Sequence, residues 1–252
     1  MTEAVVRSAR GLTDASRERR FYIRMAWFVL ALIALGFAPS FYLKPFNLFS
    51  YPRPNPPLVA NLMVHGAVFT AWVAVFMVQV SLVSAGRRDL HRALGAAAMV
   101  LGAALIPVMY LTAVWQVARA SQPPFTDPLT WTVVPLIGIP ALAALLWLGW
   151  RESRRDLQAH KRLMLAIMLI LTEPAISRLP LLPPTWFGFT FQAALSLLVF
   201  VPLFVWDRRT LGQLHWATRL GAGLFALIVT AQAFFLATPG IWSAFAARLL
   251  GV

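Results

Sequence analysis

Three of the four histidines stand where an apolar segment of the chain begins. Each follows two arginines and a leucine, as in Arg87-Arg88-Asp89-Leu90-His91. Imidazole is the commonest metal ligand in proteins and is also an axial ligand of haem iron. If the three segments begin at one level of a bundle, His91, His160 and His215 can hold a metal ion or haem b together. The alternative is that these histidines are solvated beside the arginines or contact lipid phosphate.

The segment that begins at His91 also has small residues that leave room for a planar cofactor beside the imidazole. His91, Gly95, Ala98 and Gly102 recur at helical spacing and share one face, so little side chain surrounds the imidazole. This face can admit a bulky planar cofactor. Small faces in membrane helices also allow another helix to approach closely, and the sequence leaves both interpretations open.

A second group of polar residues lies toward the other ends of the apolar segments. Each stands about six to eight residues from the end of its segment, or about 9–12 Å along a helix. The group consists of His65, Tyr110, Glu173, Gln192 and Gln232. A carboxylate in a membrane helix costs about 2.5–3.5 kcal/mol and normally faces the bundle with a partner. We expect Glu173 to pair with His65 in a ligand or proton site that the other three residues complete; a buried structural network is the alternative.

His65 also begins a polar stripe on its own segment. Trp72 and Gln79 follow it at intervals of seven residues, so all three lie on one face of a helix. We therefore include Trp72 and Gln79 in the predicted ligand or proton site.

The apolar segments that position these residues are long enough to cross a membrane. Of the 252 residues, 60% are hydrophobic and 12% are charged, compared with about 45–50% and 25% in soluble domains. A helix needs about 20 mostly apolar residues to cross a hydrocarbon core of about 30 Å. The sequence predicts an all-α, polytopic membrane bundle of about seven transmembrane helices, in a single domain (1–252) with a basic N-terminal segment (1–21). The predicted spans are 22–43, 58–84, 92–116, 128–150, 160–180, 185–206 and 219–238, and Pro174 is expected to open the backbone of the fifth.

The lysines and arginines predict the orientation of the bundle. Of the 22 basic residues, 17 fall in the N-terminal segment and in alternate loops; the other five are Lys44, Arg53, Arg119, Arg178 and Arg248. Because basic loops remain in the cytoplasm, we expect a bacterial inner-membrane protein with a cytoplasmic N-terminus and a periplasmic C-terminus. The first apolar run is too long for a signal peptide and is interpreted as an uncleaved helix. The short clusters of positive charge indicate anionic lipid headgroups at the inner face as partners, and not nucleic acid.

Other features narrow the chemistry. The chain has no cysteine, which excludes disulfides, thiolate metal sites and cysteine nucleophiles. The sequence has no phosphate loop, nucleophile elbow or metalloprotease signature. These observations favour a protein without enzymatic activity, but they do not exclude an enzyme.

At the residues singled out above, the chain resembles a family of small, uncharacterised bacterial multipass membrane proteins. The resemblance covers about residues 58–180 and rests on three helix starts. They are His65-Gly66 followed by Trp72 and Gln79, Leu90-His91-Arg92 with Gly95, and His160-Lys161-Arg162-Leu163-Met164. Histidines near opposite membrane faces also look distantly like those of di-haem cytochromes b and of proteins that assist assembly of haem–copper oxidases. The chain departs from the di-haem pattern because it lacks a histidine pair on facing helices for each leaflet.

Three functions follow from these patterns. The histidines and the resemblance imply a haem- or metal-associated protein that serves respiratory redox chemistry or oxidase assembly. The first alternative is a transporter or small-molecule sensor that uses the outer polar pocket around His65 and Glu173. The second is a structural subunit of a membrane complex, with other membrane proteins as its partners.

Overall fold

The computed structural model describes residues 3–46, 48, 58–179, 181, 183 and 185–251, with side chains described from residue 15 onward. Within these residues the chain forms helices and no β-strand. The loop that contains Arg53 lies outside the described residues. The prediction of an all-α bundle is confirmed.

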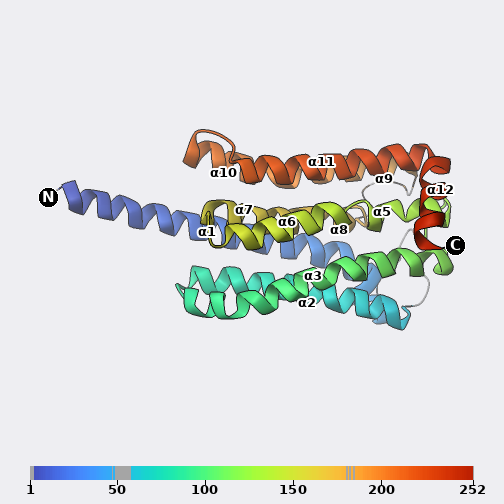
Figure 1. Ribbon diagram of the computed structural model, residues 1–252, viewed down its shortest axis with the longest axis horizontal. Coiled ribbons are helices and arrows are strands. Elements are labelled where there is room, and N and C mark those ends of the chain that lie inside the picture. Colours follow the sequence, from blue (N-terminus) through green and yellow to red (C-terminus); the bar gives the residue numbers. More distant parts are fainter. Residues whose placement is uncertain are drawn as a thin grey trace.

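The helices follow one another with short connections (Figure 1). The first helix, α1 (Glu3–Phe37), continues into a π-helical turn, η1 (Ala38–Tyr42), and a 3-10 turn, η2 (Lys44–Phe46). The remaining elements are α2 (Ala60–Ser84), α3 (Arg88–Arg119), α4 (Pro128–Trp131), α5 (Val133–Leu136), α6 (Ile139–Glu152), α7 (Leu157–Ile170), α8 (Glu173–Ile176), α9 (Trp186–Ser196), η3 (Leu197–Phe200), α10 (Val201–Leu211), α11 (Trp216–Ala237) and α12 (Pro239–Leu250).

Six stretches of the described chain are long and apolar enough to cross a membrane. They are Ala15–Tyr42, Ala60–Ser84, Arg88–Arg119, Pro128–Glu152, Trp186–Leu211 and Trp216–Ala237. Each corresponds to one predicted span, with ends that differ by a few residues. These are the features of a multipass membrane protein.

The predicted span 160–180 is the one without a matching stretch, because it contains a break. Helix α7 has 14 residues, or about 21 Å of helix, which is shorter than a hydrocarbon core of about 30 Å. The helix ends where the Thr172 hydroxyl donates to the Leu169 carbonyl at 2.6 Å. Pro174 then occupies the first turn of α8, where its missing N–H costs least. The opening expected beside Pro174 is therefore present, and it replaces a seventh continuous span with two short helices.

The basic turns gather at one end of the bundle. Figure 1 shows the turns α2–α3, α6–α7 and α10–α11 at the end from which the N-terminus extends, and the C-terminus at the opposite end. We call these the inner and outer ends, following the orientation that the charges predict. Helix α12 crosses the outer end, where the Trp242 indole N–H donates to the Thr132 hydroxyl at 3.0 Å.

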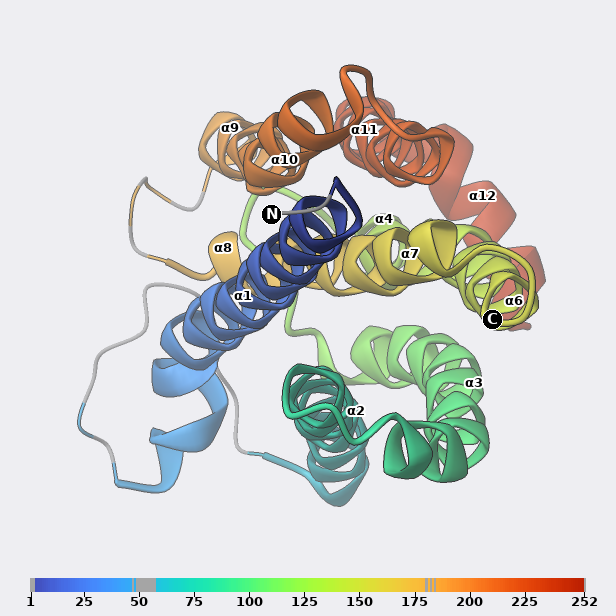
Figure 2. The ribbon, with the colours of Figure 1, turned by 90° about the vertical axis from the view of Figure 1, so that its left-hand side faces the viewer.

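Helix α7, in the predicted span 160–180, forms the centre of the core. Helix α7 packs against α6, α11 and α1 (Figure 2), and most of its residues from Leu163 to Leu169 are buried. Glycines allow this close packing. A Cβ added to Gly221 of α11 would lie 2.5 Å from the Cβ of Ala166 on α7, and one added to Gly36 would overlap the backbone of Ala175 on α8. Small residues thus bring the neighbouring helices into contact with the central one.

Candidate functional site

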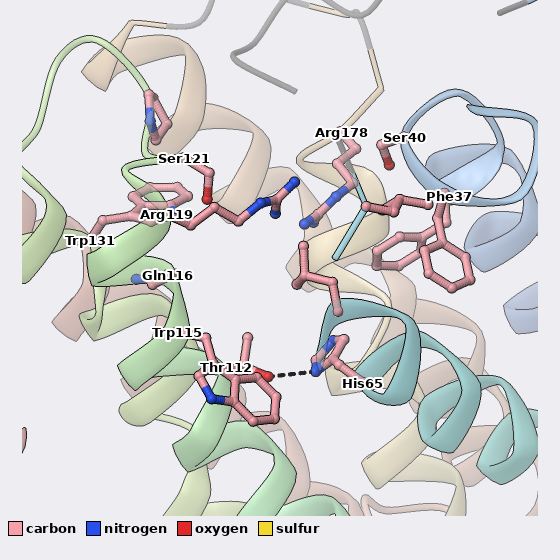
Figure 3. A pocket seen from close by; sticks show the side chains of 14 residues that line it. Phe37, Ser40, His65, Thr112, Trp115, Gln116, Arg119, Ser121, Trp131 and Arg178 are labelled. Carbon is pink, nitrogen blue, oxygen red and sulfur yellow. Dashed lines mark hydrogen bonds between the residues drawn. The ribbon is translucent and has the colours of Figure 1, made fainter. Parts of the chain in front are cut away.

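A cavity of about 170 Å³ lies near the outer end, between the ends of α1, α2 and α3 and the chain after α8 (Figure 3). Its polar lining includes two arginines, a histidine, a glutamine and three hydroxyl groups, and its walls are aromatic. The described lining residues are Phe37, Ser40, Phe41, Leu58, Leu62, His65, Thr112, Trp115, Gln116, Arg119, Ser121, Pro123, Trp131 and Arg178. The lining therefore combines polar and apolar side chains, as in many small-molecule sites.

His65 reaches the cavity from α2 and is fixed by a hydroxyl on α3. Its Nδ1 lies 2.8 Å from the Thr112 Oγ1, and the Thr112 hydroxyl donates its proton to the Val108 carbonyl at 2.7 Å. A hydroxyl has one proton to donate, so Nδ1 of His65 must be the donor in the first contact. One face of the ring stacks on Phe69, with ring centres 4.5 Å apart. In the neutral ring, Nε2 is then a hydrogen-bond acceptor.

Two guanidinium groups dominate the charge of the cavity. Figure 3 shows the side chains of Arg119 and Arg178 extending toward each other from α3 and from the chain after α8. Arg178 is oriented by a hydrogen bond from its Nη1 to the Pro174 carbonyl at 2.6 Å, and its guanidinium lies 4.6 Å from the centre of the Phe37 ring. Burial, together with the positive charge of Arg119, lowers the pKa of Lys44, so a third cation lies close by. None of the described lining residues is a carboxylate.

The other residues of the predicted outer site are distributed over separate contacts. Glu173 is buried at the start of α8 and is not among the described residues that line the cavity. The Tyr110 hydroxyl donates to the Leu249 carbonyl of α12 at 3.3 Å. Gln192 is buried and donates to the Leu179 carbonyl at 2.7 Å, and Gln232 is buried in α11. Of the five residues, only His65 lines the cavity, and its pairing with Glu173 remains a prediction.

The polar stripe on α2 continues into the core. Trp72 is buried against α3, where a Cβ added to Gly102 would lie 2.8 Å from its indole ring. At Gly102, therefore, the small face of α3 admits a neighbouring side chain. The indole N–H of Trp72 and both amide atoms of Gln79 are buried without a hydrogen-bond partner among the described residues.

At the inner end, two of the three predicted histidines meet. The ring centres of His91 on α3 and His160 on α7 lie 6.3 Å apart, with their planes at 74°. The Nδ1 of His160 lies 2.8 Å from the Gly149 carbonyl, and because a carbonyl only accepts, Nδ1 carries the proton.

His215 has a different role. It caps α11, where its Nδ1 accepts from the Ala217 N–H at 3.2 Å, and its Nε2 lies 3.7 Å from an Asp156 carboxylate oxygen. Among the described residues, no group of three or more histidines, aspartates or glutamates is placed to hold a metal ion. The expected three-histidine metal site is therefore not assembled, although its first two members are adjacent.

The sequence reasoning missed a buried ion pair close to these histidines. Arg162 on α7 and Asp207 on α10 are 1% and 0% exposed, and Nη2 of Arg162 lies 2.7 Å from Oδ1 of Asp207. The guanidinium also donates to the Gln158 side-chain oxygen at 2.7 Å. Oδ2 of Asp207 accepts from the backbone N–H of His215 at 2.9 Å. This network joins α7, α10 and the start of α11. In the sequence, Arg162 stands out only as one of the basic residues at the inner end. The available signal for its partner is Asp207, an acid directly after the predicted span 185–206.

Comparison of the chain with protein-family models, with curated proteins and with solved structures finds no match. The resemblance seen in the sequence therefore remains a prediction. The function has to be argued from the geometry of these sites.

Proposed function

We propose that this membrane protein binds a small anion, a carboxylate or a phosphate, in the outer cavity, as a transporter or a small-molecule sensor. The observation that carries the proposal is the convergence of Arg119 and Arg178 on one cavity (Figure 3). An anion between two guanidinium groups is attracted by both.

The chemistry of the lining suits such a ligand. A guanidinium has five N–H donors, so the bond from Arg178 to the Pro174 carbonyl leaves others available for a ligand. Arginine binds carboxylates and phosphates through two parallel hydrogen bonds, which are about twice as strong as those between neutral groups. The rings of Trp115, Trp131 and Phe37 line the same space, and the exclusion of water by these rings strengthens the attraction.

The size of the cavity limits the ligand. A volume of about 170 Å³ lies below the range of about 300–1,000 Å³ typical of sites for drug-sized molecules. We therefore expect a compact anion, on the scale of phosphate or a short carboxylic acid. Protonation of His65 at Nε2 would add a third donor, and in the neutral ring the same atom can accept a proton from the ligand.

The other functions expected from the sequence have different support. A structural subunit does not require a cavity lined by arginines. A haem- or metal-associated role in respiratory redox chemistry or oxidase assembly draws its support from the pair of His91 and His160, which lies at the opposite end of the bundle. The outer cavity therefore favours anion binding over these two alternatives.

The direct test is a binding measurement on the purified full chain in detergent. Inorganic phosphate, acetate and succinate are titrated separately by calorimetry, with the shift in thermal unfolding temperature as a second readout. We expect at least one of them to bind, and Arg178→Gln to weaken that binding about ten- to a hundredfold, as the loss of a charged hydrogen bond implies.

The matched control is Arg248→Gln. It removes the same charge from an exposed position on α12 at the outer end, away from the described lining, and should leave binding unchanged. If none of the three anions binds, or if the Arg178 and Arg248 variants bind equally well, the proposal is wrong.

A further inference from the structure

We propose that His65 makes the outer cavity selective for an oxyanion that carries a proton at neutral pH, such as hydrogen phosphate. Sulfate and the phosphodiesters of lipid headgroups carry no proton and would be rejected. The proposal rests on the proposed function, whose anion it assigns to a chemical class and whose selecting residue it names.

The selection depends on which nitrogen of His65 carries the proton. The Thr112 hydroxyl donates its only proton to the Val108 carbonyl at 2.7 Å, so it accepts in its contact of 2.8 Å with Nδ1 of His65. Nδ1 therefore carries the proton of the neutral ring. Nε2 is left as an acceptor, and it has no hydrogen-bond partner among the described residues.

The surrounding helices hold this tautomer in place. Val108 and Thr112 are one turn apart on α3, so the helix itself orients the hydroxyl. One face of the imidazole stacks on Phe69, which limits rotation of the ring. The imidazole lines the same cavity as Arg119 and Arg178 (Figure 3). Because the cavity holds only about 170 Å³, an anion beside the two arginines also meets the imidazole.

The polar groups of the cavity then differ in what they offer a ligand. The guanidinium groups of Arg119 and Arg178 only donate hydrogen bonds, whereas Nε2 of the neutral ring only accepts one. Hydrogen phosphate has oxygens for the arginines and an O–H for the imidazole. Sulfate has the same tetrahedral shape and nearly the same charge but no O–H, so one of its oxygens would face the lone pair of Nε2. The hydroxyls of Ser40 and Ser121 can donate or accept, and they do not distinguish the two anions.

The expected preference is large enough to measure. A site that pairs with a hydroxyl of its ligand rejects an analogue without that hydroxyl, because a polar group of the site is left unpaired. One unpaired neutral acceptor weakens binding about ten- to a hundredfold. Attraction to the arginines cannot produce such a difference, because hydrogen phosphate and sulfate are alike in size and charge.

The test compares three anions on the purified full chain in detergent at about pH 8, where an imidazole with the usual pKa of about 6.5 is neutral. Inorganic phosphate, sulfate and dimethyl phosphate are titrated separately by calorimetry. Dimethyl phosphate represents the phosphodiester of a lipid headgroup, so the comparison distinguishes free phosphate from lipid. We expect phosphate to bind at least tenfold more tightly than either of the other two.

Two variants connect this preference to the imidazole. His65→Phe keeps a ring beside Phe69 and removes Nε2, so phosphate should bind about tenfold more weakly while sulfate binding stays the same. Thr112→Val keeps the side-chain volume and removes the acceptor of Nδ1, which allows the ring to carry its proton on Nε2; sulfate should then bind more tightly than in the wild type. Thr210→Val is the matched control. The Thr210 hydroxyl also donates to the carbonyl one turn earlier, that of Trp206 at 2.8 Å, but at an exposed position on α10, so the wild-type preference should remain.

The possible outcomes separate this proposal from anion binding itself. If sulfate or dimethyl phosphate binds as tightly as phosphate, or if only a carboxylate binds, the assignment to a protonated oxyanion is wrong while anion binding stands. A preference for phosphate that survives both His65→Phe and Thr112→Val would overturn the role of His65. If no anion binds, both proposals are wrong.

Discussion

Arginines occur at both ends of the bundle, but their surroundings differ. At the inner end, Arg162 is fully buried and contacts Asp207 and Gln158, and Asp207 in turn accepts from the backbone N–H of His215 at the cap of α11. At the outer end, Arg119 and Arg178 line a cavity whose described lining contains no carboxylate. The first arrangement encloses the cation in the fold, whereas the second places cations beside a space that a ligand can enter. The same residue type therefore joins helices at one end and can recognise an anion at the other.

The largest expected effect comes from breaking the inner ion pair. Asp207→Asn keeps the volume of the side chain and leaves Arg162 charged and buried without its counter-ion, so we expect a loss of about 3–5 kcal/mol in the free energy of unfolding. The measurement is equilibrium unfolding in mixed micelles with increasing sodium dodecyl sulfate. Asp89→Asn is the control, because Asp89 pairs with Arg87 at an exposed position and should have little effect.

The double variant Arg162→Met with Asp207→Leu tests the reason for this loss. If the cost arises from an uncompensated charge, replacing both partners with apolar side chains should recover most of the stability. A double variant as unstable as Asp207→Asn would mean that the hydrogen bonds to Gln158 and His215, and not the paired charges, hold these helices together.

A smaller effect is expected where α11 contacts the central helix. Gly221→Ala places a methyl group 2.5 Å from the Ala166 side chain, and overpacking of this kind costs about 1–3 kcal/mol. Gly223→Ala, two residues away, meets no atom within 4 Å and should be neutral or slightly stabilising, since alanine favours helix over glycine by about 1 kcal/mol. Equal unfolding curves for the two variants would contradict the close approach of α7 and α11.

A still smaller effect on stability is expected at the outer end. Arg178→Gln removes one hydrogen bond to the Pro174 carbonyl, so stability should change by about 1 kcal/mol. In the same unfolding assay, Asp207→Asn should cost several times more. If Arg178→Gln is as destabilising as Asp207→Asn, Arg178 belongs to the fold and the contrast between the two ends disappears.

The two ends also differ in how far they follow from the sequence. Six of the seven predicted spans match a stretch that can cross a membrane, with ends that differ by up to seven residues, because length and hydropathy alone decide whether a segment can do so. The predicted span 160–180 has no such stretch. Counting along the chain placed Tyr110, Gln192 and Gln232 at a depth but did not give the side of the helix that each would face. In the structure, Tyr110 contacts α12 and Gln192 contacts the chain after α8, and neither faces the cavity.

The charges show the same limit. Counting arginines by loop predicted which turns share an end of the bundle, yet it placed Arg119 and Arg178 only in outer loops and Arg162 only in an inner one. Which arginine meets an acid and which meets a cavity depends on how helices distant in sequence pack together. His91 and His160 both begin a predicted span, and their rings do lie side by side, whereas a role as metal or haem ligands stays a prediction. His215 begins a span too, but it caps its own helix.

The network of Arg162, Asp207, Gln158 and His215 at the inner end should also make the free energy of unfolding depend on pH. Arg119 and Arg178 should not. Burial lowers the pKa of His215, and Arg162 lowers it further, while the carboxylates of Asp156 and Asp207 oppose the shift. Because the folded pKa lies below the unfolded value of about 6.5, the folded state binds fewer protons. The stabilisation is therefore fully present above about pH 6.5 and is lost as the pH falls. His215→Asn should flatten this part of the unfolding profile, and the other histidines, present in both proteins, cancel in the comparison. A wild-type chain that gains stability relative to His215→Asn on acidification would show that the Asp156 carboxylate, 3.7 Å from Nε2, outweighs burial and keeps the ring charged.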